Sequence, residues 1–204
     1  MKKLLLNLFI TLFLFQFTGF SQTNSANLYD EYRSSTLSLK FISDDLYDST
    51  GIGANINHQL KDTNFAIQFG SSIDWIADVD LNFLTIYGGL HYIIDFGDWH
   101  LVPGFSFHHT KLNDFDYYYM SANTNTFSLM LRSKLTENSI VSLGFASTGY
   151  SDLQALGYQY YVNGRATTLL GKISTKISDD SYFDVALSTA SGTTSVLFGL
   201  TTTY

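Results

Sequence analysis

Apolar and polar residues alternate along most of the chain, so that every second side chain is apolar. A period of two is typical of a β-strand whose two faces meet different surroundings. After the first twenty or so residues, no window of helical length keeps apolar residues three and four apart. The pattern predicts an all-β protein of about ten antiparallel strands, with eight as the alternative count. The alternating segments begin near Leu37, Ile52, Phe65, Leu84, Leu101, Phe127, Val141, Leu169, Phe183 and Val196.

The connections between these segments fall into two groups. Every second connection is a short turn rich in Asp, Asn, Ser and Gly, and these turns lie at 61–64, 97–99, 136–139 and 178–181. The intervening connections are on the whole longer, at 43–50, 77–81, 110–124, 150–165 and 191–193. Short turns at one end and longer loops at the other are typical of bacterial outer-membrane barrels. Residues 36–204 are therefore predicted to form a transmembrane antiparallel up-and-down β-barrel.

The chemistry of the polar face distinguishes this barrel from a soluble β-sandwich. A sandwich would present many Lys, Glu and Asp side chains to water on its outer face. Here the face between the apolar positions carries mainly Gly, Ser, Thr, Asn and Gln, and charged residues make up 14% of the chain against about 25% in soluble domains. Small neutral groups suit an enclosed, partly hydrated lumen, so the barrel is the favoured architecture.

The first 21 residues have the order of a secretory signal peptide. Lys2 and Lys3 precede an apolar run over 4–17, and a small and polar stretch over 18–21 follows. Cleavage is predicted after Ser21, which leaves 22–35 as an N-terminal lead-in to the barrel. The whole chain carries a formal charge of −7, and a basic face for nucleic acid is not expected. The chain contains no cysteine, so it has neither a disulfide framework nor a thiolate zinc site.

The last strand ends on alternating residues and an aromatic side chain. Phe198, Leu200 and Tyr204 lie on one face of this segment. The whole pattern resembles small outer-membrane β-barrel proteins of Gram-negative bacteria, of the OmpA, OmpX and OmpW type, and the signal peptide resembles those of Bacteroidota. The resemblance implies that the terminus is the signal read by the outer-membrane insertion machinery. It also implies an outer-membrane location, with membrane lipid and lipopolysaccharide as the surroundings.

Charged and imidazole side chains on the polar face are expected to form a network inside the lumen. Positive and negative charges are nearly balanced, which indicates internal pairing, and Lys176 and Asp184 should be neighbours beside the turn at 178–181. The expected lumen is blocked in part by polar side chains and has at most a low conductance. The predicted network comprises Lys40, Asp74, His91, Asp95, His108, Arg132, Lys134, Lys172, Lys176 and Asp184.

Aromatic residues form two predicted groups. Those near strand ends should lie at the lipid headgroup level, namely Trp75, Tyr92, Phe96, Trp99, Tyr182 and Tyr204. Tyrosines in or beside the two longest loops offer rigid, amphipathic contact area, either as a binding surface for an extracellular glycan or protein, or as ordinary strand residues beyond the membrane. These are Tyr117, Tyr118, Tyr119, Tyr158, Tyr160 and Tyr161.

Catalytic patterns known from outer-membrane barrels fit the sequence poorly. Asp98 and His100 match one half of the omptin protease pattern. The acidic pairs that resemble the other half, Asp78 with Asp80 and Asp114 with Asp116, are predicted in the outer loops, about 30 Å of strand away. His108 precedes His109 and Thr110 and is similar to the His-x-Ser of lipid A deacylases, with threonine as the hydroxyl and no carboxylate placed to orient the histidine. No catalytic, cofactor-binding or metal-binding residue is therefore assigned.

Three functions remain for such a barrel. The first is a non-catalytic outer-membrane protein with a structural, surface-binding or accessory role. The second is a narrow porin-like channel for small solutes, which conductance would reveal. The third is a lipid-modifying hydrolase, which mutation of His108 should inactivate.

Overall fold

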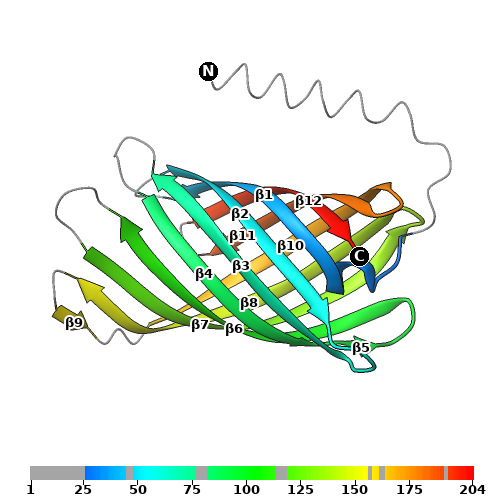
Figure 1. Cartoon of the computed structure of the whole chain (residues 1–204), viewed down its shortest axis with the longest axis horizontal. Coiled ribbons are helices and arrows are strands. Elements are labelled where there is room, and N and C mark those ends of the chain that lie inside the picture. The colour runs from blue at the N-terminus through cyan, green and yellow to red at the C-terminus, as the bar shows by residue number, and fades with distance from the viewer. Residues whose placement is uncertain are drawn as a thin grey trace, which may run out of the picture.

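The computed structural model describes residues 26–44, 48–76, 82–113, 119–155, 158–160, 164–190 and 193–204. Within these ranges, ten long strands form one antiparallel sheet that closes into a barrel (Figure 1). Two short strands accompany them, with β5 paired to β6 and β9 paired to β8. The strands are β1 (Arg33–Asp44), β2 (Asp48–Gln59), β3 (Phe65–Ile76), β4 (Asn82–Tyr92), β5 (Ile94–Asp95), β6 (Trp99–Asn113), β7 (Tyr119–Thr136), β8 (Ser139–Ala155), β9 (Tyr158–Tyr160), β10 (Gly164–Ser178), β11 (Ser181–Ala190) and β12 (Thr193–Thr203).

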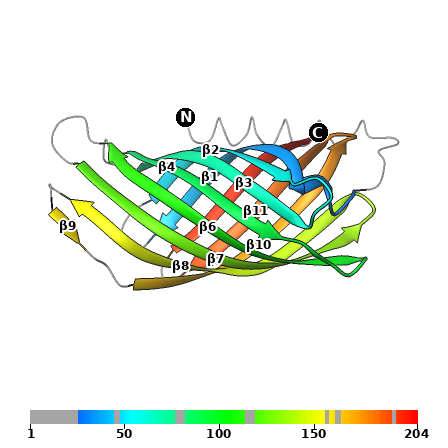
Figure 2. The same cartoon turned by 60° about the horizontal axis from the view of Figure 1, so that its bottom comes forward.

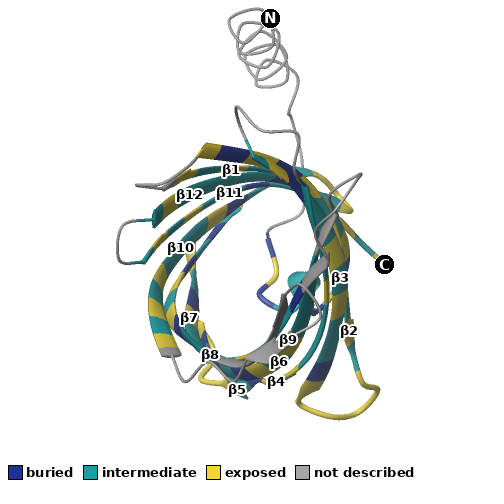
Figure 3. Ribbon diagram, turned by 90° about the vertical axis from the view of Figure 1, so that its left-hand side faces the viewer, coloured by how far each residue is buried: buried dark blue, intermediate teal, exposed yellow. Residues whose placement is uncertain are grey.

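The first and last long strands close the barrel. β1 pairs with β12 along its length, with Leu37 opposite Leu200, and β10 pairs with β8 as well as with β11. The strands run obliquely across the barrel (Figure 1, Figure 2), and the view along the barrel shows a closed ring (Figure 3). Closure pairs the backbone groups that an open sheet would leave at its edges, which is the condition for strands in lipid. The prediction of an antiparallel barrel of ten strands is confirmed.

Burial in this barrel is the reverse of that in a soluble protein. Large apolar side chains point outward, with Leu37 66% exposed, Phe69 59% and Leu143 57%, whereas Arg132 and Asp184 point inward and are 4% and 2% exposed. A water-soluble protein does not expose large apolar side chains around a whole sheet, because their contact with water is unfavourable. An apolar outer band around a polar interior is the arrangement of a transmembrane β-barrel. The soluble sandwich is thereby excluded.

The short turns gather at one end of the barrel. The described connections at 60–64, 96–98, 137–138 and 179–180 lie at the end where the chain finishes, on the right in Figure 1. The opposite connections include residues outside the described ranges, as does the predicted signal peptide at 1–21. β1 begins at Arg33, three residues before the expected start of the barrel at 36.

No helix in the described part of the chain is long and apolar enough to cross a membrane.

One member of the expected aromatic group at the headgroup level lies elsewhere. Trp75, Tyr92, Phe96, Trp99 and Tyr204 are all at least 38% exposed, as expected. Tyr182 is 3% exposed, because its neighbour Phe183 takes the outward position and alternation turns Tyr182 into the lumen. The prediction for Tyr182 was therefore wrong.

Candidate functional site

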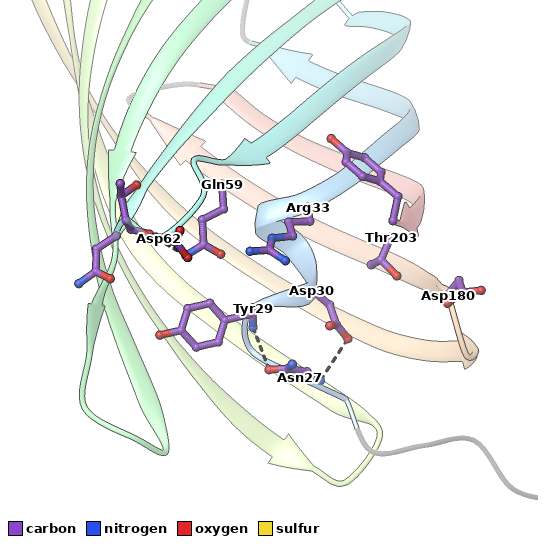
Figure 4. A pocket seen from close by; sticks show the side chains of 11 residues that line it. Asn27, Tyr29, Asp30, Arg33, Gln59, Asp62, Asp180 and Thr203 are labelled. Carbon is purple, nitrogen blue, oxygen red and sulfur yellow. Dashed lines mark hydrogen bonds between the residues drawn. The ribbon is translucent and has the colours of Figure 1, made fainter.

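The chain before the first strand folds back into the lumen. Residues 26–32, hereafter the plug, end in the single 3-10 turn η1 (Asp30–Tyr32). Asn27 shapes this turn, since its side-chain oxygen accepts a hydrogen bond from the Tyr29 backbone N–H at 3.1 Å and its carbonyl accepts one from the Asp30 N–H at 3.1 Å. Asparagine favours such turns because its short side chain bonds to the backbone two residues further on. Figure 4 shows these three residues on the N-terminal segment between the walls of the barrel.

Hydrogen bonds tie the plug to several sides of the ring. The Ala26 N–H donates to the carbonyl of Glu137, in the turn between β7 and β8, at 2.6 Å. The Tyr182 hydroxyl, on β11, donates to Asp30. The Tyr29 hydroxyl donates to Asp95 on β5 at 2.8 Å. β5 and β7 both pair with β6, and β11 lies beyond β8 and β10, so these bonds hold the plug to one half of the ring near the end that carries the short turns.

Two small apolar clusters hold the plug in addition. Ala26 and Leu28 pack with Ile140 and Tyr182 of the wall, and all four are almost completely buried. Tyr32 packs with Ala66, Ile93 and Val102 on the other side of the lumen. Burying each of these large side chains contributes about 1.5–3 kcal/mol, so the plug is a packed element rather than a loose tail.

A charged cluster lies where the plug meets the wall. It consists of Glu31 from the plug and Arg132, Lys172 and Asp184 from the wall. The Arg132 guanidinium is 2.5 Å from one Glu31 carboxylate oxygen, and the Lys172 ammonium contacts the other. Lys172 is also 3.4 Å from the Asp184 carboxylate, which accepts a hydrogen bond from the Thr201 hydroxyl at 2.6 Å. Glu31 thus bridges two wall cations with its two oxygens.

Arg132 takes most of its contacts from the plug. It donates to the Leu28 carbonyl at 2.8 Å, contacts Glu31, and lies over the Tyr32 ring at 4.7 Å. The wall offers it the Ser142 hydroxyl at 3.4 Å. The cavity that remains in the cluster measures about 10 Å³, which is room for about one water molecule. The plug and the wall are therefore packed closely together at this cluster.

The cluster keeps the Glu31 carboxylate ionised. Burial alone would raise the pKa of Glu31, but Arg132 and then Lys172 lower it from 4.5 to about 2. Its side chain is 27% exposed. At neutral pH the site is therefore a network of ions, two positive and two negative, rather than a neutral contact.

A second ion pair crosses the lumen wall above the plug. Lys40 on β1 and Asp74 on β3 are 2.7 Å apart, although β2 lies between their strands. Gly51 of β2 is paired with both of them. A Cβ atom at Gly51 would collide with the Asp74 carboxylate, so the absent side chain is what lets Lys40 reach across.

The histidines of the expected lumen network contact polar or aromatic neighbours. His91 lies 2.6 Å from the Gln68 side-chain oxygen. His108 lies 2.8 Å from the Ser106 hydroxyl and its ring stacks on Tyr87. His108 is therefore held by a hydroxyl group and an aromatic ring rather than oriented by a carboxylate in these contacts.

Three further members of the expected network are placed as follows. Asp95 lies at the short-turn end, where it accepts hydrogen bonds from Tyr29 and from the Gly97 N–H at 2.6 Å. Lys134 is exposed at the rim beside a register shift of β7. The Lys176 ammonium lies 5.9 Å from the Tyr182 ring centre. Lys176 and Asp184 are diagonal neighbours across β10 and β11, as the sequence predicts. The ion pair of Asp184 is formed with Lys172, its other diagonal neighbour, which also contacts Glu31.

A vestibule opens between the plug and the short-turn rim. This cavity of about 600 Å³ is lined by plug residues and by rim residues that include Arg33, Asp62 and Asp180, as Figure 4 shows. Its walls are mainly polar. It lies between the mouth of the barrel and the plug, so the plug lies inside the lumen rather than over its mouth.

The C-terminal residues of the expected insertion signal lie on or near the outer face. Leu200 is 53% exposed and Tyr204 63%. Phe198 contacts the ring of Phe41 at 6.2 Å. The Tyr204 hydroxyl donates to the Asn57 carbonyl at 2.8 Å, which fixes the end of the chain to β2.

Several predicted residues lie outside the described ranges. Tyr117, Tyr118 and Tyr161 are among them, as are both acidic pairs of the omptin-like pattern. Tyr119 begins β7, and Tyr158 and Tyr160 are the ends of β9. Among the described residues, no three His, Asp or Glu side chains come together as a metal site.

The plug was not predicted from the sequence, in which 22–35 was expected to be a lead-in to the barrel. The seven residues of the plug are too few to show a periodicity. One signal was available: the predicted balance of lumen charges was incomplete, because five inward cations (Lys40, Arg132, Lys134, Lys172 and Lys176) exceed three inward carboxylates (Asp74, Asp95 and Asp184). A surplus of positive charge in a lumen calls for a carboxylate from elsewhere, and Glu31 supplies it.

No family model matches the sequence, and no curated protein matches it either. Solved structures match the fold. The NanC porin has a TM-score of 0.53 with 8% identity, over 83% of this chain and 100% of that one. The β domain of the Bordetella autotransporter BrkA has 0.51 with 8% identity, over 84% and 98%. An outer membrane channel from Pseudomonas putida F1 has 0.50 with 8% identity, over 91% and 100%. At this identity the likeness concerns the fold alone, and this chain therefore has the fold of outer-membrane β-barrel proteins.

Proposed function

We propose that the protein is an integral outer-membrane channel for small solutes whose narrow lumen is closed, in the state described, by its own N-terminal plug. The observation that carries this proposal is that a segment of the chain itself, rather than side chains of the wall alone, occupies the lumen. Residues 26–32 lie inside the lumen near the short-turn end and are joined to the wall by hydrogen bonds, ion pairs and packing. Such an element can leave without unfolding the barrel, whereas a lumen filled by wall side chains cannot open.

Three further points support a channel over a purely structural role. The wall of the lumen is polar and carries ion pairs such as Lys40–Asp74. The vestibule leads from the rim to the plug. A porin and an outer membrane channel are among the similar folds. The short-turn end would face the periplasm, so the plug would close the channel from the periplasmic side.

The surroundings of the protein follow from the same proposal. The signal peptide would direct the chain through the inner membrane, and the terminus at Phe198, Leu200 and Tyr204 would be read by the insertion machinery. The outer band would contact lipid and lipopolysaccharide. An extracellular glycan or protein ligand at the loop tyrosines, the OmpA, OmpX and OmpW type of scaffold and a Bacteroidota source stay predictions from the sequence, as does the absence of catalysis.

Planar-bilayer recording tests the proposal. The unchanged protein should show small or rare openings, and Glu31→Gln should open several-fold more often because the plug loses its ion pairs. Asp179→Asn removes an exposed carboxylate at the same rim, in the turn between β10 and β11, and should behave as the unchanged protein. Heat-modifiable migration on gels confirms that each variant is folded. Folded variants that never conduct would overturn the channel and leave the structural role.

A further inference from the structure

The charged cluster has a property that plug closure alone does not require. Arg132 and Lys172 approach the two different oxygens of one carboxylate, Arg132 at 2.5 Å from one oxygen and Lys172 at the other. A guanidinium and an ammonium placed in this way match a planar anion with two oxygens. Packing with Leu28 and Tyr32 already holds the plug. The ion pairs of Arg132 and Lys172 with Glu31 therefore add specific recognition of a carboxylate group to this packing.

Departure of the plug leaves the wall with surplus positive charge. Glu31 and Asp30 leave together, whereas Arg132, Lys172 and Lys176 stay, and Asp184 is the carboxylate that remains beside them. Arg132 is 4% exposed and would lose three plug partners, the Leu28 carbonyl, the Glu31 carboxylate and the Tyr32 ring. Once the plug has left, these cations face the water of the lumen, and their surplus charge attracts an anion to this level.

We infer that Arg132 and Lys172 form a carboxylate-binding site in the open lumen, and that Glu31 occupies it in the closed state as a tethered competitor. The solute of the channel is then a small acid. The inference rests on the proposed channel, because a solute meets these cations only by entering the lumen. Solute and plug exclude each other at this site, so the acid promotes release of the plug by mass action.

Cysteine labelling tests this competition without measuring a current. The chain has no cysteine, and Ala26 of the plug is 0% exposed. A full-length Ala26→Cys protein in lipid nanodiscs should react slowly with a bulky maleimide, at a rate that reports plug release. Cysteine is small and apolar enough to replace a buried alanine.

Citrate is the probe, and sodium chloride at equal ionic strength is its control, because salt alone weakens ion pairs. Citrate should speed the labelling of Ala26→Cys at least about fivefold beyond sodium chloride, and uncharged glycerol should have no effect. Adding Lys172→Gln should remove the citrate effect, because one of the two cations is lost. Adding Asp179→Asn, which removes an exposed carboxylate in the turn between β10 and β11, should leave the effect unchanged. Adding Glu31→Gln should give fast labelling even without citrate.

The outcomes separate this inference from the proposed channel. Citrate no better than sodium chloride overturns the carboxylate site, whether or not the protein conducts. Inorganic phosphate that acts where citrate does not overturns the assignment to a carboxylate. Labelling that responds to citrate in a protein that never conducts supports the site and contradicts the channel. A citrate effect that survives Lys172→Gln places the acid elsewhere and also overturns the inference.

Discussion

At the scale of single residues, the lumen depends on side chains that are absent as much as on those present. Lys40 reaches Asp74 over the intervening β2 because Gly51 has no Cβ atom. Gly104 makes room for the His91 ring in the same way. A pattern of alternation assigns a residue to the inward face, but the size of its cross-strand neighbour decides what it can touch.

Replacing Gly51 by valine tests this role. The new side chain would collide with Asp74 and displace the ion pair, so we expect a loss of stability of about 1–3 kcal/mol. Gly171→Val is the matched control, because a Cβ there meets its nearest neighbour, a methyl group of Leu143, at 3.5 Å. The measurement is the temperature at which the compact form disappears on semi-native gels. Equal temperatures for both variants would contradict the assignment.

The charge on Glu31 should make closure sensitive to acid. Because its pKa is lowered from 4.5 to about 2, its ionic contribution is complete above about pH 4.5 and disappears as the pH falls towards 2. The contribution corresponds to about 3 kcal/mol. The open fraction in bilayers should therefore rise over this pH range, and Glu31→Gln should show a much flatter profile. A profile identical in both proteins would refute this role of Glu31.

At the scale of elements, the plug is held by groups far away along the chain. The Tyr182 hydroxyl contacts Asp30 across 152 positions, and Arg132 contacts Leu28 across 104. No local sequence preference fixes such an element, beyond the turn that Asn27 favours. Its docking is the sum of several moderate contacts, which makes it separable from a barrel whose strands are paired along their length.

Removing one hydroxyl should loosen the plug measurably. In Tyr182→Phe, Asp30 loses a hydrogen bond to a charged acceptor, which contributes about 1–2 kcal/mol, equivalent to a factor of about 5–30 in occupancy. Labelling of Ala26→Cys should accelerate by that factor. Tyr92→Phe, on the outer face, should leave the rate unchanged. If both tyrosine variants label at the same rate, the Tyr182 contact does not hold the plug.

At the scale of the whole molecule, the distribution of polar and apolar surface is that of a protein in lipid. Leu37, Phe69 and Leu143 are exposed around the ring, and ions are kept inside. The pairing of β1 with β12 removes the free sheet edges. Both features require a hydrocarbon environment outside the barrel and some water inside it.

This surface should make the folded protein dependent on detergent or lipid. The protein should partition into the membrane fraction and migrate as a compact form on semi-native gels until it is boiled. Transfer into detergent-free buffer should precipitate it, because the apolar band has no other partner. A protein that stays monomeric and soluble in water would contradict the fold that Figure 1 shows.

The strands, their approximate number and the residues that face lipid could be predicted from the amino-acid sequence alone. This is possible because alternation along a strand is a local property: Phe69 and Gln68 must point to opposite faces wherever the strand lies. The location of the short turns followed in the same way. Lys40, Asp74, Arg132, Lys172 and Asp184 were likewise assigned to the lumen by their position in the alternation.

Which of these charges meet, and which segment lies across the lumen, depends on the three-dimensional arrangement of the strands. The pairing of Asp184 with Lys172 rather than Lys176 depends on register and on the position of Glu31. The position of Glu31 depends in turn on contacts from β5, β7, β10 and β11, which only the closed ring brings together. A seven-residue segment without periodicity does not indicate where it will dock, since most of the partners that hold it lie more than 60 positions away.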